Sequence, residues 1–360
     1  MATKKQVRDE IDRRAAENER TLPPILSAPP FNASQKLLDV LKAEIRVRYL
    51  TFSIALHFPN FYRWLASIPD PSGTFVDLGA AVMAFGQARD RYLDPQGPVT
   101  KVLDQINARR SGQALLTAIT TSAAANFVHI IPDLIFRLTG TPSADADIVD
   151  IPTARHVTAV GMPILDPDRS KPWTGLVDVN GNFVGSGEGT RLDPGTGKEI
   201  HGDDSFVEFS PEAFVSGSPS RPAGPGMEPD EVLFHELVHA SRQVIGAVYF
   251  MPVNQNYDNE EEYLAIVLSN IYIRNKNRGA ALRGDHDQSI LREPDRFLDN
   301  VQRVDLEPRM LLERFRLWQL SLFNDLAGIA ASVTPFNPVR QYKEELDAGK
   351  AAAGALKRRP

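Results

Sequence analysis

The chain of 360 residues contains no cysteine. Disulfides, thiolate metal sites and a cysteine nucleophile are therefore excluded, and any metal must be held by histidine and carboxylate. No apolar run approaches the roughly 18 residues that span a membrane, and the charged N-terminus lacks the apolar core of a secretory signal peptide. The net charge of −6 gives no support for nucleic-acid binding, which favours a basic surface. We expect a protein made in the cytoplasm, with no membrane span and no nucleic-acid partner.

The sequence His-Glu-Leu-Val-His at residues 235–239 is the most informative motif of the chain. The segment 231–244 contains no glycine or proline, begins with acidic residues and is followed by Gly246, so we expect a helix. His235 and His239 are one helical turn apart and can bind one zinc ion at about 2.0–2.1 Å. Glu236 then lies beside the metal, where it can accept a proton from the attacking water.

Short motifs of this kind also occur by chance on solvent-exposed helices. Here apolar residues surround the two histidines, namely Phe234, Leu237, Val238 and Ala240. The predicted helix is therefore apolar nearly all round, which is typical of a buried helix. Buried histidines beside a carboxylate need partners, because an unpaired polar group in the interior is costly. The sequence favours a zinc hydrolase over a surface helix.

Catalytic zinc uses three protein ligands, so we expect a third one downstream of the motif. Three successive glutamates, Glu260, Glu261 and Glu262, begin a predicted helix over 258–276. Acidic helix starts are favoured by the helix dipole, and we expect two of the three carboxylates to be solvated for that reason. Both Glu261 and Glu262 lie on apolar stripes of this helix, so periodicity does not choose between them.

The length permits one large domain or two modest ones. Residues 1–110 are predicted to be a mainly helical N-terminal region of unknown role, and 111–290 carry the motif and the candidate third ligand. Residues 291–360 are predicted to form a C-terminal helical segment and a tail. The expected fold class is α+β, with a small sheet beside the zinc helix and additional helices at both ends.

Local patterns predict several individual elements. The apolar residues from Leu37 to Phe52 follow helical spacing, and 308–332 read as one long amphipathic helix. The runs 126–131 and 205–209 read as strands. A strand just before the zinc helix is expected to form a substrate-facing edge, where a peptide can add as another strand.

The motifs between Ser111 and His286 resemble those of the NleD-type effector zinc metallopeptidases, which pathogenic bacteria inject into host cells. The pieces that carry the resemblance are Ser-Gly-Gln-Ala-Leu-Leu at 111–116, Val-Glu-Phe-Ser-Pro at 207–211, the zinc helix, Glu-Glu-Tyr-Leu at 261–264, and Asn270-x-x-x-Arg274 followed by Leu282-Arg283. The resemblance implies a zincin-like metallopeptidase core. It also implies a secreted effector or toxin that cleaves a protein in a target cell, either a host protein or one of a rival bacterium.

The resemblance further implies roles for single residues. In similar zinc peptidases with a Glu-Glu pair at this point, the first glutamate binds zinc, which selects Glu261, with Glu262 as the alternative and Glu260 exposed. The family also carries an Arg-x-x-Tyr element that stabilises the tetrahedral intermediate. This chain has Arg283-x-x-His286 instead, so Arg283 and His286 are expected to donate hydrogen bonds to the oxyanion.

Two other functions remain open at this point. A zinc amidase acting on a small amide or on peptidoglycan would need a narrow, closed cleft. A non-catalytic scaffold stabilised by zinc would need a fourth protein ligand to close the coordination. Under the effector hypothesis, the protein is made in the bacterial cytoplasm, leaves without a Sec signal peptide, and has a secretion-system or chaperone partner besides its protein substrate.

Overall fold

The computed structural model describes residues 4–69, 78–122, 126–139, 191–192, 199–200, 204–216, 224–247, 253, 257, 259–285, 289–299 and 308–357. Its fold is α+β, as expected. The chain forms two compact units. The first comprises Met1–Asp104, His129–Asp147 and Phe206–Pro222, and the second comprises Gln105–Val128, Ile148–Ser205 and Ala223–Pro360. Neither unit is a continuous segment of the sequence.

The first unit contains nearly all of a small four-stranded sheet with the strand order β1-β2-β3-β6. Its strands are β1 (Ile45–Arg48), β2 (Ile54–Phe58), β3 (Val128–Ile131) and β6 (Ser205–Glu208). β1 and β2 are antiparallel. Ser205 N donates to Phe127 O and Phe209 N donates to Ile131 O, so the hydrogen bonds step in the same direction and β6 runs parallel to β3. The predictions of strands over 126–131 and 205–209 are confirmed.

Helices make up the rest of the first unit, apart from its loops. They are α1 (Lys4–Ser27), α2 (Gln35–Lys42), α3 (Phe61–Ala66), α5 (Leu78–Leu93), α8 (Leu134–Thr139) and the 3₁₀ helix η2 (Pro211–Ala213), and α6 (Pro98–Asn107) extends from this unit into the second. Ile11 of α1 packs in a buried cluster with Ala66 and Leu134. The first unit therefore has its own apolar core.

The helix predicted from Leu37 to Phe52 is wrong beyond Lys42. The α2 helix ends there because Ala43 is extended, with φ −74° and ψ 134°. The β-branched residues that follow favour a strand, and β1 turns back into β2 through Leu50, which has a φ of 49°. All five residues of β2 are buried, so the strand lacks the polar alternation that would have distinguished it from a helix.

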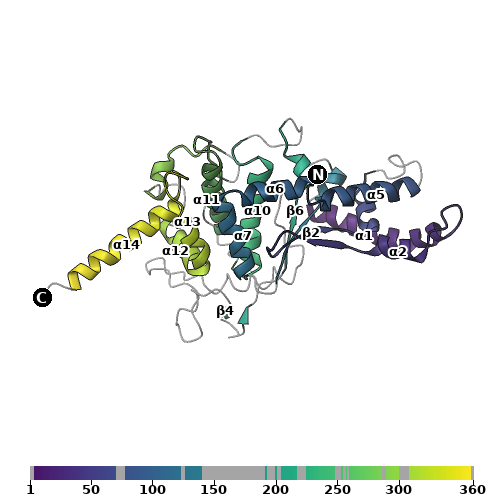
Figure 1. Ribbon diagram of the computed structural model, residues 1–360, viewed down its shortest axis with the longest axis horizontal. Helices are drawn as coiled ribbons and strands as arrows, with labels where there is room; N and C mark the ends of the chain where they lie inside the picture. The colour runs from purple at the N-terminus through teal and green to yellow at the C-terminus, as the bar shows by residue number, and fades with distance from the viewer. Residues whose placement is uncertain are drawn as a thin grey trace. The chain divides into compact units, whose positions relative to one another are not determined.

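The second unit is mainly helical. Its elements are α7 (Arg110–Ser122), α10 (Pro229–Gln243), α11 (Glu260–Lys276), η3 (Pro294–Asp299), α12 (Pro308–Trp318), α13 (Leu320–Ala327), α14 (Pro338–Lys357), and the short strand pair β4 (Arg191–Leu192) and β5 (Glu199–Ile200). The α7, α10 and α11 helices lie side by side (Figure 1). The predicted zinc helix is α10, and the predicted helix over 258–276 is α11. None of the helices in the described ranges is long and apolar enough to cross a membrane.

Polar contacts hold α10 antiparallel to α11. At the start of α10, Asp230 accepts hydrogen bonds of 2.7 Å from the Tyr272 hydroxyl and from Lys276 Nζ, both near the end of α11. At the other end of α10, Arg242 binds Glu261 at the start of α11, with Nε 2.7 Å from Oε2. The two helices are thus fixed to each other at both ends, and this fixes which of their residues face one another.

The long helix predicted over 308–332 is interrupted in the structure. Gln319 has φ −138° and ψ 59°, which separates α12 from α13. Its buried side chain accepts a hydrogen bond of 3.4 Å from Arg242 Nη1 and donates one of 3.3 Å to Ser241 Oγ. These contacts with α10 explain the interruption, because apolar periodicity along α12 and α13 carries no information about them.

The close approach of α6 and α7 gives a test of the fold. A Cβ on Gly112 would lie 1.9 Å from the carbonyl oxygen of Ile106. Gly112→Ala should therefore lower the free energy of unfolding by about 1–3 kcal/mol, the usual cost of overpacking. Gly86→Ala in α5 is the control, since nothing lies within 4 Å of the added carbon, and it should be neutral or stabilising. Equal thermal midpoints for the two variants would show that Gly112 and Ile106 are not in such close contact.

Candidate metal centre

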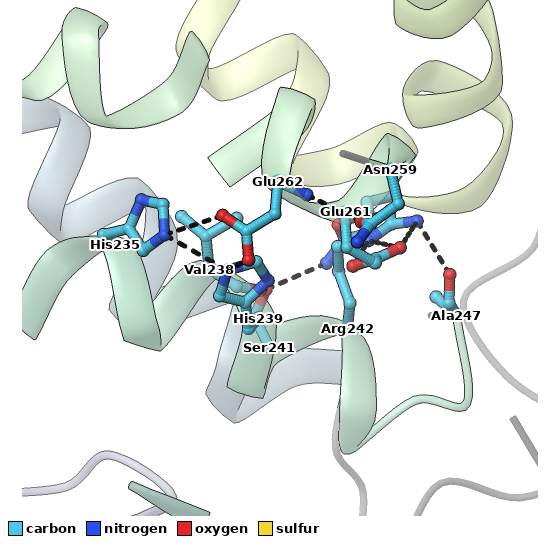
Figure 2. Close-up of polar contacts among 10 residues, drawn as sticks. His235, Val238, His239, Ser241, Arg242, Ala247, Asn259, Glu261 and Glu262 are labelled. Carbon is cyan, nitrogen blue, oxygen red and sulfur yellow. Dashed lines mark hydrogen bonds and ion pairs between the residues drawn. The ribbon is translucent and has the colours of Figure 1, made fainter. Parts of the chain in front are cut away.

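Two histidines and one glutamate from neighbouring helices come together in the second unit. His235 and His239 of α10 have their Nε2 atoms 3.2 Å apart. The Glu262 carboxylate of α11 lies across from both, with Oε2 3.3 Å from His235 Nε2 and Oε1 3.4 Å from His239 Nε2. Figure 2 shows the carboxylate turned toward the two rings. Among the described residues, this is the group of acidic or histidine side chains whose ligand atoms are close enough to hold a metal.

These distances agree with the geometry that zinc requires. Zinc in a tetrahedral site lies about 2.0–2.2 Å from nitrogen and oxygen ligands, so neighbouring ligand atoms are roughly 3.3 Å apart. The observed separations of 3.2 to 3.4 Å match that spacing. Histidine and carboxylate are also the ligand types of catalytic zinc sites. The residues present therefore fit a zinc ion.

The expectation that Glu261 faces the histidines does not match the structure. Its carboxylate turns away from them and forms a buried ion pair with Arg242, at 2.9 and 2.7 Å from Nε and 2.8 Å from Nη2 (Figure 2). Arg242 Nη2 also donates to the carbonyl of Ala247 at 2.7 Å. Glu262, the alternative left open by the periodicity of the helix, occupies the position beside the histidines. The reason is that a buried guanidinium needs a carboxylate, and Glu261 is the one that supplies it.

Glu260 is also placed differently from the expectation, because it is buried rather than exposed. Its side chain is in an ion pair with Arg314 of α12, and the residue is only 4% exposed. Asn259 caps α11, with its side chain accepting a hydrogen bond of 3.1 Å from Glu262 N. The three carboxylates at the start of α11 therefore do not simply face water. Each of them contacts a different partner.

The charges around the triad favour a cation at its centre. Burial lowers the pKa of His235 to about 3, so this ring is neutral and its lone pairs can bind a metal. Burial also lowers the pKa of His239, but the Glu262 and Glu236 carboxylates outweigh it and raise the pKa to about 9. Burial raises the pKa of Glu262, but the two histidines outweigh it and the net pKa is well below the usual value. The site thus holds a proton on His239, which a metal ion would replace.

Glu236 is buried in α10 next to the triad. Its negative charge contributes, after that of Glu262, to the raised pKa of His239. Its charge also acts on Arg283, whose pKa is lowered by burial and raised in part by Glu262 and Glu236.

Arg283 comes to the same region from the segment after α11. It is buried, and its Nη1 lies 3.5 Å from Nδ1 of His235. Ser269 Oγ is at the same distance from that Nδ1 atom. A His235 ring that binds metal through Nε2 carries its proton on Nδ1, and Ser269 can accept the hydrogen bond from it. His286, the other residue expected here, lies outside the described residues.

Sequence patterns assigned no role to Arg242, Ser269 or Asn270, although Asn270 belongs to one of the pieces that carry the family resemblance. A signal was present for the last two, because Ser269 and Asn270 interrupt the otherwise apolar run 264–273 of α11. Polar residues inside a buried helix need partners, so such an interruption marks a contact with another part of the chain. Arg242 gave a similar signal as a charged residue near the end of a buried helix.

The comparisons with known proteins identify the family of the chain. The family model Peptidase_M91, described as an effector protein family, matches residues 94–306, which is more than half of the chain. The chain therefore belongs to this family of metallopeptidases, which confirms the resemblance to NleD-type effectors. The matched residues include α10, α11 and Arg283. No curated protein and no solved structure matches the chain.

Glu261 and Glu262 form a matched pair for testing the site. Glu262→Gln should lose stoichiometric zinc, because it removes a charged ligand, while the metal-free protein keeps most of its stability. Glu261→Gln should instead lower the free energy of unfolding of the metal-free protein by about 3–5 kcal/mol, because it leaves Arg242 buried without its counter-charge.

Elemental analysis and urea unfolding of both variants separate the two roles. The opposite result would be zinc loss in Glu261→Gln only, together with full zinc content and a stable fold in Glu262→Gln. It would contradict the assignment of Glu262 to the metal and of Glu261 to Arg242.

Proposed function

We propose that the protein is a zinc-dependent endopeptidase, with His235, His239 and Glu262 as the metal ligands and Glu236 as the general base. The observation that carries the proposal is the triangle of ligand atoms at zinc-like separations with a buried glutamate beside it. We further propose that this centre belongs to a zincin-like core within 111–290. The regions 1–110 and 291–360 would then serve other roles.

In this mechanism, a bound zinc ion would polarise the scissile carbonyl and favour deprotonation of the attacking water. Glu236 accepts the proton of that water and delivers it to the nitrogen of the leaving amine. The lowered pKa values of His235 and Glu262 favour the protonation states that ligands require, whereas His239, whose pKa is raised to about 9, has to release a proton when the metal binds. Burial of the site strengthens each of these charge interactions, since the local dielectric is lower than that of water.

Arg283 is proposed to stabilise the oxyanion that forms when water attacks the carbonyl. It is a buried cation at the ligand set, and an oriented donor at a developing negative charge lowers the barrier. His286 is proposed to assist it, on the strength of the Arg-x-x-His spacing alone.

Membership of an effector family supports a substrate outside the cell that makes the protein. We propose a protein substrate in a target cell, with delivery from the bacterial cytoplasm through a secretion system, assisted by a chaperone. The target cell is either a host cell or a rival bacterium, and in the second case the protein acts as a toxin.

The number of ligands bears on the alternative of a zinc-stabilised scaffold. Within the described part of the chain, the group contains three donors, which matches the set of a catalytic rather than a closed structural site. A buried Glu236 beside the ligands also serves no purpose in a structural site. The endopeptidase is preferred over an amidase because the family is one of peptidases.

Substitution of Glu236 tests the chemistry separately from metal binding. Glu236→Gln keeps the shape of the side chain but cannot accept a proton, so kcat on a peptide substrate should fall by roughly 10²–10⁴-fold. Zinc content should stay near one equivalent per chain, as expected for a site with three protein ligands. Normal turnover by a folded, zinc-loaded Glu236→Gln protein would exclude this mechanism.

A further inference from the structure

The backbone of Arg283 is held by one side chain of α11. Arg283 N donates to Oδ1 of Asn270 at 2.8 Å, and Nδ2 of Asn270 donates to Arg283 O at 2.8 Å. Arg283 also forms an isolated antiparallel bridge with Ile290. Asn270 is fully buried, at 0% exposure, in the middle of the helix that carries Glu262. Its amide therefore satisfies both polar backbone groups of Arg283, which fixes the segment after α11 to the ligand helix.

The side chain of Arg283 is held by a glycine from a different segment. Gly226 lies three residues before Pro229, the first residue of α10, and has a φ of +82°, a conformation that favours glycine. A Cβ at this position would lie 2.6 Å from Cδ and 3.2 Å from Cγ of Arg283. The loop backbone therefore packs directly on the aliphatic part of the arginine. A larger residue here would strain the backbone and force the Arg283 side chain to move.

Together these two contacts leave the guanidinium at the ligand set. Its Nη1 lies 3.5 Å from Nδ1 of His235, and the Glu236 and Glu262 charges act on it. An arginine side chain has several rotatable bonds and loses considerable entropy when it is fixed, so its position has to be enforced by packing. A guanidinium displaced by about 1 Å would lose much of its effect on a transition state.

We infer that Gly226 and Asn270 are positioning residues that hold the guanidinium of Arg283 beside His235. Asn270 fixes where the arginine leaves the backbone, and Gly226 fixes the path of its side chain. The consequence for catalysis rests on the proposed function, but the placement itself does not. Gly226 lies in the loop that leads into α10, and Asn270 lies on α11, so the arginine is oriented by the ligand helix α11 and by the loop before α10.

The placement is tested by nitrogen NMR of the histidine rings in metal-free protein labelled with ¹⁵N-histidine. Arg283→Ala should shift the Nδ1 signal of His235, because it removes the neighbouring cation. Gly226→Ala should shift the same signal, and the double variant should look like Arg283→Ala alone. Gly224→Ala is the matched control, because it also puts a side chain at a positive φ in the same loop but at an exposed position, and it should leave the signal unchanged.

An unchanged His235 signal in Gly226→Ala, where Arg283→Ala shifts it, would overturn the role of the glycine. An unchanged signal in Arg283→Ala would overturn the placement of the arginine. If Gly226→Ala does not fold, Asn270→Ser replaces it, since a shorter side chain cannot make both backbone contacts. These outcomes do not depend on peptidase activity, so they stand whether or not the proposed function is correct.

Kinetics with zinc-loaded protein and a mixture of quenched-fluorescent peptides gives the second measurement. Arg283→Ala should lower kcat by about 10²–10³-fold, and Gly226→Ala should lower it by up to about 10²-fold. In the Arg283→Ala background, Gly226→Ala should change kcat by less than about twofold, because it acts through the arginine. Full additivity of the two losses would show that Gly226 has only a structural role.

Discussion

The metal site depends on how three successive carboxylates at the start of α11 are paired. Successive residues of a helix differ in direction by about 100°, so Glu260, Glu261 and Glu262 face three different partners. The first two are in buried ion pairs with Arg314 and Arg242, and the third meets the histidines. A rotation of α11 by one residue would leave a buried guanidinium without a counter-charge, which costs several kcal/mol. The two structural ion pairs therefore decide which glutamate is available for the metal.

This dependence explains which features the sequence could predict. The zinc helix, β3, β6 and α11 were predicted because their signals are local: periodicity, caps and the spacing of two histidines. The choice of Glu262 was not predictable, because Arg242 lies 19 residues from Glu261 and Arg314 lies 54 from Glu260. The break at Gln319 was missed for the same reason, because its contacts with α10 outweigh the local helical pattern. The β1–β2 hairpin is a local pairing and was missed because β2 is buried along its whole length, so it lacks polar alternation.

The charge distribution of the site links its structure to the proposed chemistry. The charges of Glu262, Glu236 and Glu261 raise the pKa of His239 and make a cation favourable at the ligand set, while burial lowers the pKa of His235. Arg283 supplies a positive charge on the Nδ1 side of the His235 ring, where its side chain packs against the backbone of Gly226. Under the proposed function, the base, the metal position and the cation lie on α10, on α11 and in the segment after α11, which suits a metal-assisted hydrolysis.

The most direct test of this account is the location of the metal in crystals of the zinc-loaded protein. Anomalous diffraction at the zinc absorption edge should give one strong peak per chain, within coordination distance of Nε2 of His235, Nε2 of His239 and a carboxylate oxygen of Glu262. Glu261 should remain in its ion pair with Arg242. A peak coordinated by Glu261, or the absence of any peak between the two histidines, would contradict the account.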